Sequence, residues 1–224
     1  MPHSIPFPML GRSELGLKTW QLYSLLLLAN LIVLWLFNEF ILTREAYHSL
    51  LSERMEATRV DEYFDFLRSA TRWGLAAQPV VLLLQVTFVA LLIQMPLVLM
   101  FIDISFKSLF RLAVFASFVT PLSGFIRFLW LARLESTEIT QNVLNMMPFS
   151  LNHLLSPALD SSLAYSTLGK FSVFEGMWCM VIYKGLVATA RVKRDTAALL
   201  VFVLWTGLLL FQWGLSAYLQ EVNS

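Results

Sequence analysis

Long apolar runs separated by short polar segments dominate the sequence. A run of about 20 residues is the length that crosses a bilayer as an α-helix, whereas the strands of a membrane barrel give alternating segments of about 10 residues. The pattern therefore predicts an all-α, polytopic membrane protein. A short N-terminal tail (1–19) should precede a single five-span membrane domain (20–219). The expected spans cover residues 20–42, 74–102, 108–132, 171–190 and 196–219.

Prolines and arginines disturb two of these expected spans. Pro79 and Pro96 lie near the ends of the second span, so each should bend the helix or mark its true boundary. The third span contains Pro121 and holds Arg111 and Arg127, which should lie near the interfaces or extend their side chains toward them.

Two longer polar segments connect the spans. In residues 44–73 apolar side chains recur at helical spacing between charged ones, which predicts an amphipathic helix. This helix should lie at the interface or lead straight into the second span. In residues 135–169 we expect a short helix that ends before Pro148. The half-apolar stretch after it, 149–169, should lie along the membrane surface or re-enter the membrane slightly.

The orientation follows from the distribution of Lys and Arg, which accumulate in short cytoplasmic segments. The total numbers of Lys and Arg residues expected on the two sides of the membrane are nearly equal. The hairpin between the last two spans, however, concentrates Arg191, Lys193 and Arg194 in the short sequence RVKRD, and no Lys or Arg follows it. We therefore expect a multi-pass integral membrane protein with its N-terminus in the cytoplasm and its C-terminus outside, in the inner membrane if the protein is bacterial.

Composition excludes several classes of protein. The chain is 58% hydrophobic and 14% charged, against about 45–50% and about 25% in soluble domains. Its formal charge of +1 gives no field that would attract nucleic acid. The single cysteine, Cys179, excludes an internal disulfide, and His3, His48 and His153 show no metal-ligand spacing. No metal, cofactor or nucleic-acid partner is predicted.

Ionisable residues inside the expected spans are the candidate site, because each needs a partner, a wet cavity or an exit to water. By the expected topology, Glu39, Arg127 and Glu175 lie at a similar shallow depth, roughly 5 to 8 Å from the outer side. They could form an intramembrane polar cluster, with Asn38, that packs three spans together or lines a shallow cavity. Alternatively, each carboxylate simply faces the water of the headgroup layer.

Lys184 belongs to the other end of the fourth span. It is nine residues from Glu175, so the two side chains lie on opposite faces of one helix and cannot pair. Lys184 should extend toward the cytoplasmic interface. The alternative is that it faces inward, against Asp103 or a phosphate headgroup.

The C-terminal half has a recurrent order of features. A half-apolar stretch precedes a span that opens with Phe, an acid and an aromatic residue and ends at Gly-Leu; a short basic hairpin and a last span follow. This order resembles that of the Yip family of membrane proteins, the Ypt-interacting-protein superfamily. The resemblance covers about residues 75–219 and implies a five-span domain with a cytoplasmic N-terminus. For the eukaryotic relatives, the resemblance implies a role in vesicle traffic and binding to small GTPases. The matching positions are Phe174, Glu175, Trp178, Gly185 and Leu186.

No residues of an enzyme active site are recognisable: the sequence shows no nucleophile with a base, no metal-ligand carboxylate pair and no glycine-rich phosphate loop. We therefore expect a non-catalytic scaffold or accessory subunit of a larger membrane assembly, in secretion or trafficking. Its expected partners are membrane lipids and other integral membrane subunits. The alternative is a transport or lipid-handling component whose intramembrane charged residues line a path.

Overall fold

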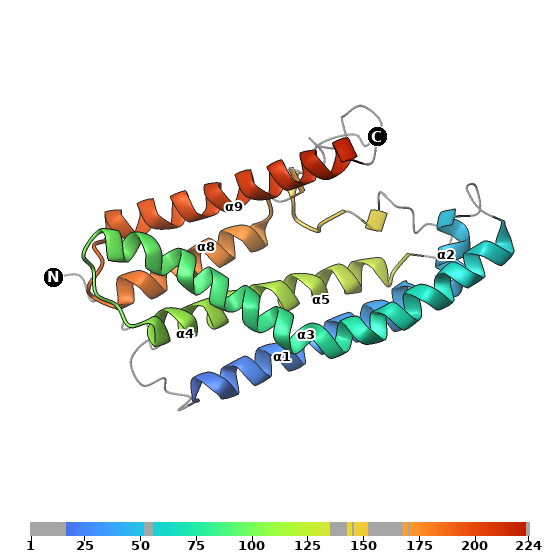
Figure 1. The fold of residues 1–224 in the computed structure, drawn as a ribbon, viewed down its shortest axis with the longest axis horizontal. Helices are drawn as coiled ribbons and strands as arrows, with labels where there is room; N and C mark the ends of the chain where they lie inside the picture. The colour runs from blue at the N-terminus through green and yellow to red at the C-terminus, as the bar shows by residue number, and fades with distance from the viewer. Residues whose placement is uncertain are drawn as a thin grey trace. The chain divides into compact units, whose positions relative to one another are not determined.

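The computed structural model describes residues 17–51, 56–134, 143–144, 146–151, 168–169 and 171–222. Within these ranges the chain is helical, and its only strand-like pairing is an isolated bridge between Ser150 and Ser172. The all-α prediction is confirmed (Figure 1). The helices are α1 (Thr19–Leu36), the π-helical η1 (Phe37–Ile41), α2 (Arg44–Leu51), α3 (Ala57–Leu99), α4 (Phe106–Ser117), α5 (Val119–Leu131), α8 (Val173–Ala188) and α9 (Arg194–Val222).

Four helical stretches in the described ranges are long and apolar enough to cross a membrane: Thr19–Ile41, Ala57–Leu99, Phe106–Leu131 and Arg194–Leu215. They correspond to the first, second, third and fifth expected spans. The fourth expected span, 171–190, forms α8, which has 16 residues. At 1.5 Å per residue this helix is about 24 Å long, shorter than the roughly 30 Å of a hydrocarbon core. A fifth crossing therefore stays a prediction.

Helix α3 joins two elements that the sequence pattern separates. It runs without a break from Ala57 to Leu99, so the later part of the amphipathic segment leads straight into the second span. Helix α3 continues through Pro79 and past Pro96, so neither proline marks a boundary of the helix. With 43 residues, α3 is about 65 Å long, about twice the thickness of a hydrocarbon core. Only part of it fits inside a bilayer.

The third span consists of two consecutive helices, α4 and α5, which meet at Phe118. Pro121 explains the interruption, because it has no N–H to donate to the carbonyl of Ser117 four residues earlier. At the junction, the amide of Phe118 donates to the carbonyl of Phe115, three residues back, at 3.2 Å.

The chain divides into two compact units. The first contains Leu83–Val119, the chain from Val173 onward and the segment up to Leu26. In this unit α8 packs against both α4 and α9, and the turn between α8 and α9 makes them the expected hairpin. Gly185 of α8 lies directly against α4: a Cβ built on it would lie 2.1 Å from Cδ1 of Leu112.

The second unit contains Leu27–Leu82 and Thr120–Ser172. Its buried core is formed by Ile41 of η1, Ala46 of α2 and Leu131 of α5. Phe37 and Phe128 pack against this core, with their ring centroids 6.1 Å apart in an edge-on arrangement. The core therefore ties the end of the first span to α2 and to the end of the third.

Some expectations lie mostly outside the described residues. They are the tail (1–19), of which only 17–19 are described, the short helix before Pro148, and the half-apolar stretch 149–169.

Candidate functional site

Asn38 and Glu39 lie in the π-helical turn that ends the first span. The side-chain amide of Asn38 donates a hydrogen bond of 2.8 Å to the carbonyl of Leu34. Turns of this wide kind occur mostly as local bulges in α-helices, often at functional sites, because they re-aim the side chains around them. Here the turn places both residues on the wall of a pocket.

Arg127 lies in α5, in the same unit, but its charged group meets a ring. Its guanidinium carbon is 5.6 Å from the centre of the Phe37 ring, a cation–π distance, and its buried Nε has no hydrogen-bond partner in the described structure. No ion pair joins Arg127 to Glu39 within the described ranges. Glu175, in the first turn of α8, belongs to the other unit. A joint cluster of these residues stays a prediction.

Lys184 and Asp103 both belong to the first unit. Lys184 lies in the last turns of α8, at the opposite end from Glu175, as expected. The backbone carbonyl of Asp103 accepts a hydrogen bond from the guanidinium of Arg191, in the turn between α8 and α9. An inward contact of Lys184 with Asp103 stays a prediction.

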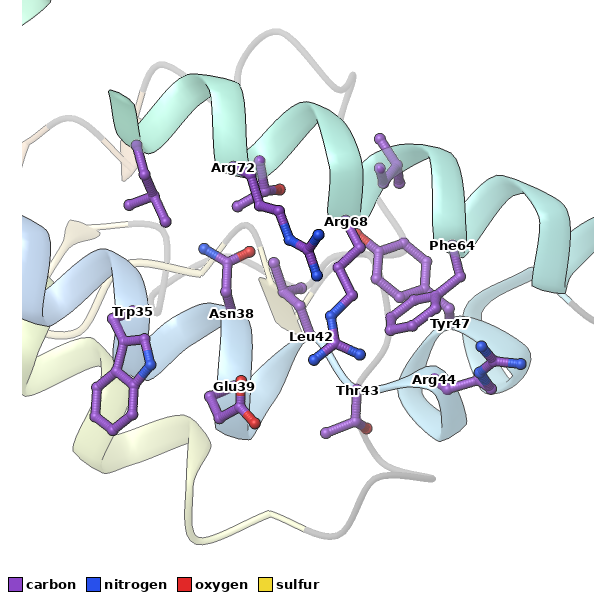
Figure 2. Close-up of a pocket in the computed structure, with 13 residues that line it drawn as sticks. Trp35, Asn38, Glu39, Leu42, Thr43, Arg44, Tyr47, Phe64, Arg68 and Arg72 are labelled. Atoms are coloured by element: carbon purple, nitrogen blue, oxygen red, sulfur yellow. The ribbon is translucent and has the colours of Figure 1, made fainter. Parts of the chain in front are cut away.

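A pocket of about 400 Å³ lies wholly within the second unit, and we call it the arginine pocket (Figure 2). Figure 2 shows Arg68 and Arg72 projecting from α3 toward the end of the first span, where Asn38 and Glu39 lie. Thus two of the predicted residues are brought together with two arginines from a distant part of the sequence. The lining residues are Trp35, Asn38, Glu39, Leu42, Thr43, Arg44, Tyr47, Phe64, Leu67, Arg68, Thr71, Arg72 and Leu75.

Ion pairs between α2 and α3 hold one side of the arginine pocket. Arg44 donates through Nη1 to Asp61 and through Nη2 to Asp65, each at 3.1 Å, and its guanidinium carbon lies 5.2 Å from the centre of the Phe64 ring. His48 Nε2 also lies 3.1 Å from the Asp61 carboxylate. These groups are half exposed, so each pair stabilises the fold only modestly, but together they orient α2.

Tyr47 of α2 packs edge-on against the rings of Tyr63 and Phe64 in α3, so the contact between the two helices should be sensitive to alkaline pH. Burial, and then the neighbouring Tyr63, raise the pKa of Tyr47 above its ordinary 10.0. The folded state thus holds the phenolic proton more tightly than the unfolded state, and stability must fall as the pH rises past 10.0. Thermal unfolding in detergent between about pH 8 and about pH 11 should show a steeper alkaline loss for the wild type than for Tyr47→Phe. Equal slopes would contradict this explanation.

Arg68 and Arg72 were not among the candidate residues from the sequence. Neither makes an ion pair or hydrogen bond with any other residue in the described ranges. Their spacing was the available signal: four residues apart on a helix, they share one face and repel each other. What the sequence did not show is that Glu39 and Asn38 lie opposite them.

The arginine pocket has the chemistry of a binding site for a polar group. Guanidinium groups bind phosphates and carboxylates, and the glutamate can receive a cation. In the described part of the chain, no group of three or more His, Cys, Asp or Glu side chains is placed to hold a metal ion. Comparisons of the chain with protein families, curated proteins and solved structures found no match.

Proposed function

We propose that this protein is a non-catalytic subunit of a larger membrane assembly, and that α9 binds a transmembrane helix of another subunit. The observation that supports this most directly is the exposure of α9. Only 6% of its most apolar stretch is buried within the chain, against 50% for Phe106–Leu131. Because lipid tails are as apolar as Leu, spans are held together by close packing rather than by the hydrophobic effect. A span with so little packing of its own is suited to packing against another protein.

The glycines of α9 support a protein partner rather than lipid. Gly207 and Gly214 lie seven residues apart on one face, and a Cβ built on either would meet nothing within 4 Å. Small residues at such positions let two helix backbones approach closely. This chain uses a glycine in that way at Gly185, which receives Leu112 of α4. The two α9 glycines are open for the same use.

An apolar groove of about 420 Å³ continues this face within the first unit. Its α3 wall includes Phe88 and Met95, and its α9 wall includes Gly207 and Phe211. A partner helix lying along the groove would contact both walls while its backbone approached Gly207.

A photoreactive phenylalanine analogue at Phe211 tests this contact. Phe211 lines the groove and is 66% exposed, whereas Phe202, nine residues earlier and hence on the opposite face, is 61% exposed. Irradiation of native membranes should join position 211 to one discrete membrane protein and position 202 to lipid. The same protein pattern at both positions, or lipid alone at 211, would argue against the proposal.

Bulk at the two glycines should break the contact. Gly207→Leu combined with Gly214→Leu should lower the yield of the position-211 crosslink by about tenfold, equivalent to about 1.4 kcal/mol of helix contact. Ala198→Leu is the matched control, because Ala198 is exposed on the opposite face of α9. If this control lowered the yield equally, the glycine face would not be the interface.

A second candidate function is lipid or solute handling, which the arginine pocket favours because a charged pocket borders a span.

The Yip-like order of residues from Phe174 to Leu186 leads us to propose secretion or vesicle traffic as the cellular process. We also propose the orientation with a cytoplasmic N-terminus, which rests on the basic turn around Lys193.

A further inference from the structure

We propose that the arginine pocket binds the headgroup of a membrane phospholipid that carries an amine, with Arg68 and Arg72 holding the phosphate and Glu39 facing the ammonium group. A structural lipid and a handled lipid are equally compatible with such a site. The inference therefore goes beyond the proposed function and does not depend on it.

The two arginines provide the phosphate site. They lie one turn apart on the face of α3 that lines the pocket, and in the described structure neither charge is neutralised by a carboxylate. Two like charges at this spacing destabilise a helix unless an anion lies between them. A phosphate accepts hydrogen bonds from two guanidinium groups at once, because each presents a planar fork of N–H donors.

The third arginine does not compete for the phosphate. Arg44 already donates to Asp61 and Asp65, so its charge is balanced within the second unit. Arg68, Arg72 and Glu39 remain as the charged lining groups without a partner in the described ranges, a net charge of +1. A phosphodiester would bring one negative charge to the two arginines, and an ammonium group would bring one positive charge to Glu39.

The position of the pocket favours a lipid over a free anion. Arg72 is the last charged residue before an uncharged stretch from Trp73 to Ile102. Glu39 and Trp35 lie in the final turns of the first span, and tryptophan is enriched at the level of the headgroups. Both walls therefore place their charges where an apolar span ends, which is where the phosphates of a bilayer lie.

Glu39 selects the kind of headgroup. Its carboxylate lies opposite the arginines in Figure 2, where the uncharged glycerol of phosphatidylglycerol would offer it no counter-charge. The ammonium of phosphatidylethanolamine would instead be attracted to it. The lining thus combines a phosphate-binding and an amine-binding side in one pocket.

Native mass spectrometry of the full-length protein in detergent, with phosphatidylethanolamine or phosphatidylglycerol added, tests the proposal. We expect the wild type to bind one phosphatidylethanolamine in preference to phosphatidylglycerol. Arg68→Gln combined with Arg72→Gln should weaken this binding by about tenfold or more, as expected for loss of charge-assisted hydrogen bonds. Arg59→Gln is the matched control, since Arg59 is exposed on α3 and does not line the pocket.

Glu39 gives an independent test, because its replacement should reverse the preference between the two lipids. Glu39→Gln should reverse the preference toward phosphatidylglycerol while the protein still binds lipid, which a merely unfolded variant would not do. Unchanged binding by the double arginine variant would overturn the proposal. Competition by inorganic phosphate would overturn it as well. If millimolar phosphate displaced the bound lipid, and the phosphate-loaded protein then bound neither lipid, the site would belong to a free anion.

Discussion

Replacement of Gly185 by alanine should destabilise the protein by about 1 to 3 kcal/mol, the range for an overpacked core. The added Cβ would lie 2.1 Å from Cδ1 and 3.0 Å from Cδ2 of Leu112, a side chain that is 1% exposed. Leu112 must therefore change its rotamer inside a packed site, or α8 must move away from α4. The free energy of unfolding in detergent measures the loss.

The same helix provides the control. Gly176 of α8 has nothing within 4 Å of a built Cβ, so Gly176→Ala should be neutral or stabilise the helix, because alanine is the better helix former. Leu112→Ala should recover part of the stability lost in Gly185→Ala, since the two residues interact directly. Equal losses at the two glycines, or strictly additive effects of Gly185→Ala and Leu112→Ala, would contradict this packing.

Truncation of Ile41 to alanine should cost roughly 2 to 5 kcal/mol, because it leaves a cavity in the core of the second unit. Ile41 is 2% exposed and packs with Ala46 and Leu131, so it joins the end of the first span to α2 and to the end of the third. Chemical unfolding of the purified protein measures the change. Ile32→Ala in the same span is the matched control, because Ile32 is 47% exposed and its loss opens no cavity. A loss at Ile32 as large as that at Ile41 would show that the effect does not come from the core.

The spans could be predicted closely because their physical cause is local. A run such as Trp20 to Leu42 is apolar over the length that a bilayer requires, and the helix of the structure covers Thr19–Ile41. The position at which a helix ends depends less on the local sequence. Pro79 was expected to bend the second span or mark its boundary. Helix α3 continues through Pro79, so this proline marks no boundary, and membrane helices tolerate proline when neighbouring groups satisfy the backbone.

The arginine pocket shows what the sequence could not provide. Asn38 and Glu39 were recognised because polar residues inside an apolar run are conspicuous. Arg68 and Arg72 lie in a segment full of charges, where only their spacing of four residues distinguishes them from Arg59. Only the return of the chain through α2, fixed by the pairs of Arg44 with α3, places them opposite Glu39.

The mass of the native assembly tests the proposed function most directly. The tagged protein would be purified from its own membrane in a gentle detergent, and the mass and composition of the particle determined. We expect a particle heavier than the 25.6 kDa chain by the mass of at least one foreign membrane subunit in fixed stoichiometry. A lone monomer, or an oligomer of this chain alone, would contradict the role of an accessory subunit.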